Sequence, residues 1–277
     1  MILKNGFWQA EIWEDFGMNT VSLQYAGTEI LRTPGSRETL AQSSVVYGLP
    51  LQFPANRTAD GCFVVDGVDF SLPINEPARN CHIHGSLAKA AFRVTEVRED
   101  SVCAVLENQA AVFPLPFVLR VHYWLDAEGY HQEFRFENTG NTRLPLCFGL
   151  HSCFAQQDFL SVGIGRKLHR DDRFLATGEF LPEGALENAI STGFDPRRQA
   201  FSEAYEIGSR TARIGRFSYR VSDHFSHWIF WKPKQDSAFF CIEPQCGAPN
   251  ALNTGMGLQT LLPGEARTFS THITCSL

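Results

Sequence analysis

Short runs of strand-forming residues, separated by turn residues, recur along this chain and restrict how it can fold. The runs either alternate apolar and polar side chains or are fully apolar, as in strands with one or two buried faces. Residues 62–72 place Asp-Gly between two such runs, which indicates a β-hairpin. Further strands are expected within residues 91–108, 117–140, 216–222, 227–233 and 237–244. No long window has a 3.6-residue period, and the best helical candidate, residues 199–206, is short.

This pattern predicts an all-β chain. Residues 160–200 are the most polar part and are expected to form connections over one surface. The 22 glycines and 14 prolines are spread throughout, so no segment stands out as a linker. We therefore expect residues 1–277 to form a single β-sandwich domain.

Charge and composition exclude some functions. A net charge of −6 offers no global attraction to nucleic acid or to an anionic membrane surface. No run of about 18 apolar residues suggests a membrane span, and residues 1–15 do not resemble a signal peptide. A cytoplasmic protein is expected, in which the eight cysteines, none in a CxxC pair, are reduced structural thiols. The sequence predicts no oligomeric state.

Two histidines, His82 and His84, stand two residues apart in "NCHIHGS" (80–86). In a regular strand they point to the same face and could hold a metal ion. Residues 85–90 supply no carboxylate as a further ligand, and Lys89 would oppose a cation. A third ligand from a distant segment remains an open alternative, and the histidines considered for it are His122, His131, His151, His224 and His227. A structural role, in which His82 and His84 both satisfy buried backbone groups, is also open.

Two further titratable residues lie in apolar surroundings. His151 is embedded in "LCFGLHSCFA" (146–155), and Glu243 ends an apolar run before Pro244. A buried carboxylate is costly without partners, so the pKa of Glu243 is expected to be raised. Each residue alone fits a structural role as well as a functional one.

Taken together, four segments resemble the aldose 1-epimerases, or galactose mutarotases. Residues 53–67 are similar to the family's Asn-Arg segment with its DG hairpin, and "CHIHG" ends in the family's His-Gly. "GLHSCF" is similar to the family's His-Pro-Tyr-Phe, and "CIEPQCGAPNALN" to its Glu-Pro segment. The segments occur in the family's order between residues 53 and 253.

This resemblance implies a large twisted β-sandwich, the supersandwich, with an open sugar cleft. It also implies that His151 is the general acid and Glu243 the general base, while Arg57 and His84 bind the sugar. Of the two histidines in "NCHIHGS", only His84 occupies the sugar-binding position, so His82 is expected at the rim or behind it.

The chain departs from the family pattern at two places. Ser152 and Cys153 replace the Pro and Tyr that follow the acid, which should alter the wall beside it. At the family's sugar-binding Asp, the best match is Ser202, with Glu203 beside it as the expected substrate-binding residue; Asp195 is another candidate. Trp228 and Trp231 are candidates for an apolar wall against the sugar.

Opening an aldose ring needs a proton delivered to the ring oxygen and another removed from the C1 hydroxyl. A histidine and a partly buried glutamate can supply these steps, and the scheme requires neither metal nor other cofactor. The expected activity is a cofactor-independent isomerase acting on a small-molecule sugar. The alternatives are a non-catalytic carbohydrate-binding protein, a glycosidase, which would normally need two carboxylates, and a mutarotase for phosphorylated hexoses; the basic residues considered for the last are Arg166, Lys167, Arg170, Arg197 and Arg198.

Overall fold

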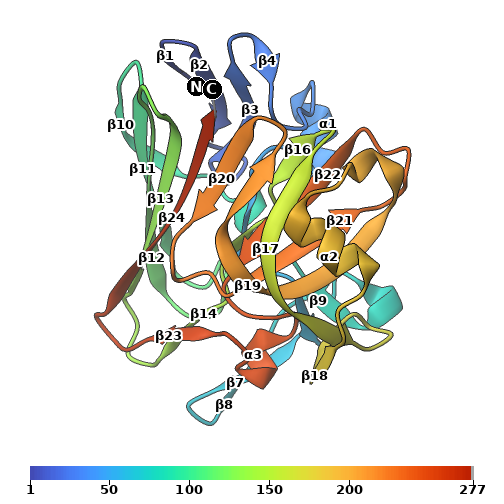
Figure 1. Cartoon of the computed structure of the whole chain (residues 1–277). Helices are drawn as coiled ribbons and strands as arrows, with labels where there is room; N and C mark the ends of the chain where they lie inside the picture. The colour runs from blue at the N-terminus through green and yellow to red at the C-terminus, as the bar shows by residue number, and fades with distance from the viewer. Residues whose placement is uncertain (276–277) are drawn as a thin grey trace.

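The computed structural model describes residues 1–275 and consists mainly of β-strands (Figure 1). This confirms the all-β prediction. The strands are β1 Ile2–Asn5, β2 Trp8–Trp13, β3 Asn19–Tyr25, β4 Thr28–Glu29, β5 Leu51–Gln52, β6 Arg57–Ala59, β7 Cys62–Val65, β8 Val68–Ser71, β9 Cys81–Ile83, β10 Arg93–Val97, β11 Ser101–Asn108, β12 Phe117–Leu125, β13 Gly129–Asn138, β14 Leu144–Leu146, β15 Gly149–Leu150, β16 Cys153–Ala155, β17 Leu160–Arg170, β18 Ala176–Leu181, β19 Phe201–Ile214, β20 Phe217–Val221, β21 His227–Lys232, β22 Phe239–Gln245, β23 Gln259–Leu261 and β24 Ala266–Cys275. The helices are α1 Arg37–Gln42, α2 Ala185–Thr192 and α3 Ala251–Thr254, with 3-10 turns at Pro77–Arg79, Leu87–Lys89 and Pro196–Arg198.

One large antiparallel sheet organises the molecule. Its strands follow the order β10-β11-β12-β13-β24-β20-β19-β21-β22-β15-β5, with β16 paired to β22 and β17 paired to β18 and β19. Figure 1 shows β10–β13 and β24 standing together on one side, while β19, β21 and β22 cross the other side. Smaller sheets join β1–β4, β6 to β9, β7 to β8, and β14 to β23.

The core follows from the period of two along the strands. In β12 the odd-numbered residues from Phe117 to Leu125 are buried, whereas the residues between them are partly or fully exposed. The same face carries the phenylalanines, whose rings contact one another across the sandwich; the members include Phe53, Phe117, Phe134, Phe136, Phe148 and Phe269. The abundant phenylalanine therefore serves mainly as core.

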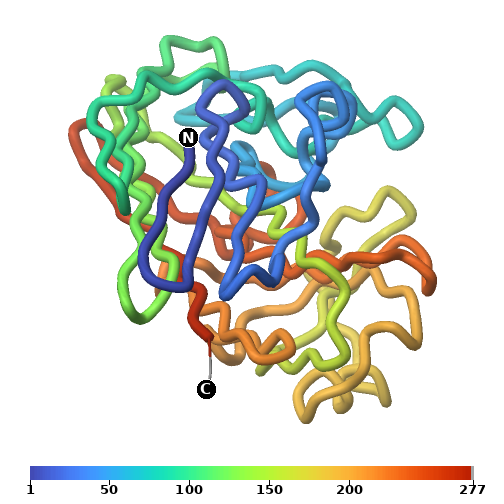
Figure 2. Tube along the Cα trace, turned by 90° about the horizontal axis from the view of Figure 1, so that it is seen from above, coloured from blue at the N-terminus to red at the C-terminus, as the bar shows by residue number. Residues whose placement is uncertain are grey.

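The structure overturns two local expectations. Residues 199–206 are not helical, because residues 201–214 form strand β19, which pairs with β17, β20 and β21. Residues 160–200 are not only connections, since they contain β17, β18 and α2. In Figure 2 the yellow and gold part of the chain, which includes residues 170–200, lies along one side, apart from the blue N-terminal strands. Polar side chains of residues 160–200 pair with one another, as Lys167 does with Glu187 and His169 with Glu179. Because these strands carry polar side chains, the sequence pattern did not indicate them.

The expected strands elsewhere are confirmed. The Asp-Gly hairpin is β7–β8, and the pairs β10–β11 and β12–β13 lie within residues 91–108 and 117–140. Strands β20 and β21 lie within the next two predicted runs, and β22 overlaps the last one and extends one residue beyond it. Strand β22 is central to this part of the sheet, because β15, β16 and β21 all pair with it. No helix in residues 1–275 is long and apolar enough to cross a membrane.

Candidate active site

A cavity of about 360 Å³ opens where the β6–β9 ribbon, the β15–β16 junction, β22 and the end of β17 meet. Its walls carry most of the residues that the sequence singled out. The lining residues are Val45, Val46, Asn56, Arg57, Arg79, Ile83, His84, His151, Arg170, Phe174, Ser202, Ile229, Trp231 and Glu243.

Strand register brings His151 and Glu243 together. Gly149 pairs with Gln245 and Cys153 pairs with Cys241, so residue 151 falls opposite residue 243. The imidazole Nε2 of His151 lies 3.3 Å from Oε1 of Glu243, and both side chains are almost fully buried. The predicted acid and base therefore meet side by side in one corner of the cavity.

Burial acts on both groups of this pair. It lowers the pKa of His151 to about 4, and it raises the pKa of Glu243 well above its ordinary value, as expected from the sequence. Both groups thus favour their neutral forms when the cleft is empty. In this neutral pair the carboxyl proton of Glu243 is the one that can be transferred, and because the two groups are in contact they titrate as a unit.

A chain of side-chain amides orients Glu243. Gln245 Nε2 donates to Glu243 Oε2 over 3.1 Å, and Asn56 Nδ2 donates to Gln245 Oε1 over 3.2 Å. The bond from Gln245 favours the ionised carboxylate and so limits the rise of its pKa. Sequence reasoning missed Gln245, although it stands two residues after Glu243 and therefore on the same face of the strand.

His84 reaches the same corner through an unusual backbone conformation. Its φ of 64° is left-handed, which is uncommon for a residue other than glycine. The following Gly85 is also left-handed, and a Cβ there would lie 2.0 Å from the carbonyl oxygen of Phe53, so no larger residue fits. The His84 ring meets the His151 ring edge-on at 5.1 Å, and its Nδ1 is buried without a partner in the structure. Burial, followed by the neighbouring His151 and Arg57, lowers the pKa of His84, so this ring enters the cavity neutral.

The two histidines of "NCHIHGS" do not lie in one regular strand, so the condition under which they would point to the same face is not met. Strand β9 ends at Ile83, and the left-handed turn at His84 redirects the chain. His82 points away, with Nδ1 2.7 Å from the carbonyl oxygen of Pro73, and it does not line the cavity. Neither His82 nor His84 belongs to the group of three metal-capable donors found in residues 1–275.

Arg57 lines the cavity and is held by a carboxylate. Its Nε and Nη2 donate to Glu76 over 2.7 and 2.9 Å, and Arg79 donates to the same carboxylate over 2.9 Å. The Phe174 ring lies against both guanidiniums. No segment of the sequence had indicated Glu76, Arg79 or Phe174.

Known proteins agree with this architecture. The sequence model of the aldose 1-epimerase family matches residues 3–274. The chain belongs to the aldose 1-epimerase family.

Relatives of known sequence or structure support the assignment. An uncharacterised protein of Escherichia coli K12, YihR, is 33% identical over 225 residues, which are 76% of this chain and 73% of that protein. A galactose mutarotase-like protein of Clostridium acetobutylicum superposes with a TM-score of 0.89 at 24% identity, covering 98% of this chain and 93% of that one. The galactose 1-epimerase of Lactobacillus acidophilus NCFM gives a TM-score of 0.79 at 14% identity, covering 100% and 94%. These structures establish the galactose mutarotase-like fold.

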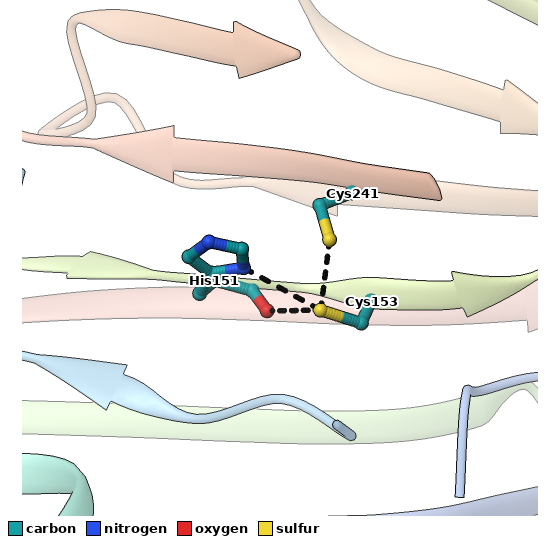
Figure 3. Close-up of side chains that lie close together, drawn as sticks. All are labelled: His151, Cys153 and Cys241. Carbon is teal, nitrogen blue, oxygen red and sulfur yellow. Dashed lines mark hydrogen bonds between the residues drawn. The ribbon is translucent and has the colours of Figure 1, made fainter. Parts of the chain in front are cut away.

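The two departures that directly follow His151, Ser152 and Cys153, lie behind it rather than in the cavity wall. The Ser152 hydroxyl lies 2.9 Å from that of Tyr219, inside the core. Cys153 Sγ lies 3.4 Å from Nδ1 of His151 and 2.8 Å from Sγ of Cys241 (Figure 3). The two cysteines and His151 are the one group of metal-capable donors found in residues 1–275. Two thiolates that bind one tetrahedral zinc ion would have their sulfur atoms about 3.8 Å apart, which is farther than the 2.8 Å between Cys153 and Cys241. In the structure the two cysteines are therefore buried thiols on the far side of the imidazole.

The remaining site residues expected from the sequence differ in whether they line the cavity. Glu203 does not line the cavity; its carboxylate lies 3.1 Å from Nζ of Lys167 and 3.9 Å from Nη2 of Arg170, because it projects from β19 on the side opposite Ser202. Asp195 caps the turn at Pro196–Arg198 and pairs with Arg197, also outside the lining. Trp231 lines the cavity with its ring 5.7 Å from that of His151, whereas Trp228 is fully buried core. Of the basic residues considered for a phosphate, only Arg170 reaches the cavity.

Proposed function

We propose that this chain interconverts the α and β anomers of an aldose by acid/base opening and closure of the sugar ring. The contact between His151 and Glu243 carries the proposal, because it joins one imidazole and one carboxyl within a cavity that Arg57 and His84 also line. Membership of the aldose 1-epimerase family supports the same activity.

The side-by-side geometry suits this reaction. The ring oxygen and the C1 hydroxyl oxygen are bonded to the same carbon, so the groups that protonate one and deprotonate the other must also be neighbours. His151 Nε2 would serve the ring oxygen and Glu243 the C1 hydroxyl. Burial favours the neutral pair when the cleft is empty, but a sugar that donates O1–H to Glu243 and accepts from Nε2–H favours the carboxylate and imidazolium.

The pair then gives one proton and takes one. Delivery to the ring oxygen and removal from O1 break the C1–O5 bond and form the C1 aldehyde. Rotation about C1–C2 presents the other carbonyl face, and closure reverses both proton transfers. An acid or a base of this kind contributes about 10²–10⁴-fold. Nδ1 of His84, which has no hydrogen-bond partner among the described residues, and the guanidinium of Arg57 would orient sugar hydroxyls.

Exchange spectroscopy by NMR tests the proposal, because it measures the rate of anomer exchange in an equilibrium mixture. Purified protein should accelerate exchange for at least one aldose, and His151→Asn should lose that effect. Binding of a sugar without accelerated exchange would favour the alternative, a non-catalytic carbohydrate-binding protein.

The organisation of the chain supports a single domain over residues 1–277, because one hydrophobic cluster extends from Leu3 to Ile273. We propose a small-molecule sugar as the partner, with no cofactor in the reaction scheme. The cytoplasmic location stays a prediction from the sequence, which fractionation of the native host would test.

A further inference from the structure

Three guanidinium groups gather at one end of the cavity, which is more positive charge than a neutral sugar requires. Arg57, Arg79 and Arg170 all line it. Their Cζ atoms lie 5.2, 4.6 and 5.3 Å from the centre of the Phe174 ring, so they surround one side chain. Among the residues that line the cavity, Glu243 carries the only carboxyl group.

Nearby carboxylates do not balance this charge. Glu76 serves two of the guanidiniums at once, those of Arg57 and Arg79. Glu203 is 3.9 Å from Arg170 and is closer to Lys167. Arg170 keeps only 12% of its side chain exposed. Burial lowers its pKa; the charge of Glu203 opposes this effect, and that of Arg57 adds to it.

Several donors of this cluster remain unused. Nε of Arg79 is buried without a hydrogen-bond partner in the structure. Among the described residues, the only hydrogen-bond acceptor of Arg170 is the backbone carbonyl oxygen of Ser202, which its Nη2 contacts. Because a guanidinium carries five N–H donors and no acceptor, the unused N–H groups need hydrogen-bond acceptors on the substrate. Oxyanions fit the planar fork of a guanidinium best.

Residue 202 also brings no negative charge to this wall. A carboxylate would accept hydrogen bonds and attract a guanidinium, whereas a serine hydroxyl is neutral. Here Ser202 lines the cavity beside Arg170. The wall beside Arg170 therefore presents a neutral hydroxyl, and no lining carboxylate competes there with an anionic substituent.

We propose that the substrate is an aldose carrying an oxyanion (a carboxylate, phosphate or sulfonate) on C6, held by Arg170 and Arg79. The proposal rests on the proposed anomer exchange and adds the substrate class to it. His151 and Glu243 must meet O5 and the C1 hydroxyl, so the charged group has to be carried elsewhere on the sugar. C6 is exocyclic, and a group on it extends away from the ring. An oxyanion next to C1 would instead face the carboxylate that Glu243 forms during the reaction.

Anomer exchange measured for matched sugars tests this. Glucose is compared with glucuronic acid and with glucose 6-phosphate, each against a protein-free blank, because these sugars differ in their spontaneous rates. An analogue with a sulfonate on C6 completes the set and shows which oxyanion the site takes. For the native protein, kcat/KM for at least one anionic aldose should exceed that for glucose by tenfold or more.

Variants show whether the arginines cause the preference. Arg170→Gln and Arg79→Gln should each reduce the ratio of kcat/KM, anionic over neutral, by about 10- to 100-fold, the range for a lost hydrogen bond to a charged group. Ser202→Asp should reduce the same ratio by placing a carboxylate beside Arg170. Arg197→Gln is the matched control, because Arg197 is exposed, pairs with Asp195 and lies outside the cavity.

The outcomes distinguish the oxyanion proposal from the mutarotase proposal on which it rests. Efficient exchange of glucose with a ratio near one, unchanged in the arginine variants, would overturn the oxyanion proposal and leave the mutarotase proposal intact. No accelerated exchange for any of the sugars would overturn both. If Arg170→Gln does not fold, Arg79→Gln and the native ratio still decide.

Discussion

Replacing Gln245 with methionine should move the pH dependence of catalysis without moving any catalytic group. Methionine keeps the length of the side chain but removes the Nε2 donor that lies 3.1 Å from Glu243 Oε2. This hydrogen bond favours the ionised carboxylate, so the pKa of Glu243 should rise further when it is lost.

The size of the shift follows from the burial of the pair. Hydrogen bonds to charged groups contribute roughly 1.5–3 kcal/mol, and one pKa unit corresponds to about 1.4 kcal/mol. Gln245→Met should therefore raise the alkaline limit of kcat/KM by about 1–2 pH units, because that limit marks loss of the carboxyl proton of Glu243. At the acid limit the neutral imidazole of His151 is protonated while Glu243 already carries a proton. This limit should stay near the pKa of His151, about 4.

The assay is kcat/KM for anomer exchange across pH, with the spontaneous rate subtracted at each pH. Gln132→Met is the matched control, because Gln132 is equally buried and hydrogen-bonds with Thr20 and Thr271 in the core. Both variants should lose stability, but only Gln245→Met should shift the alkaline limit. An unchanged limit, a downward shift, or equal shifts in both variants would refute the role given to Gln245.

Three further predictions concern chemistry and stability. His151→Asn and Glu243→Gln should each lower kcat/KM by about 10²–10⁴-fold without a lower melting temperature; retained activity in either would contradict the mechanism. Activity should survive exhaustive chelation, and loss that one specific ion restores would argue for a metal. The pKa of buried His227 is about 4, below its unfolded value of 6.5, so the unfolded chain binds protons first and stability falls from pH 6.5 to 4. In urea titrations His227→Gln should reduce this fall by up to about 3 kcal/mol, and an equal fall in both proteins would contradict the assignment.

The large-scale fold could be predicted because it depends on local patterns. Strands such as β12 alternate strictly, and hairpins such as β7–β8 carry Asp-Gly turns. Strand β19 could not be recognised in the same way. Its outward side chains include Glu203, which pairs with Lys167 of β17, so polar residues occupy positions that a simple pattern assigns to loops.

Part of the candidate site could also be predicted from local sequence patterns. The resemblance indicated His151 and Glu243, and their contact follows from the register of three short strands. The arginine cluster could not be predicted in this way, because it depends on contacts between segments that are far apart in the chain. Arg79 follows β8, Arg170 ends β17, and only the folded chain brings both against Phe174. Sequence spacing holds no information on such contacts between distant segments.

The histidines of "NCHIHGS" give the sharpest test of what the backbone adds to the sequence. Spacing alone makes His82 and His84 equivalent, but the left-handed φ of His84 separates them. Asparagine tolerates this conformation better than most residues, so His84→Asn removes the imidazole with little added strain.

His84→Asn should lower kcat/KM by more than tenfold, because the ring lines the cavity beside His151 and its Nδ1 is free to meet a sugar hydroxyl. His82→Asn should leave kcat/KM within about tenfold, or about 1.4 kcal/mol. It removes only a hydrogen bond to the carbonyl oxygen of Pro73 outside the cavity, so it should mainly lower stability, by about 1 kcal/mol. Thermal melting separates that effect from lost chemistry. Equal and severe losses of kcat/KM in both variants, with His151 dispensable, would mean that the HxH pair is the catalytic centre after all.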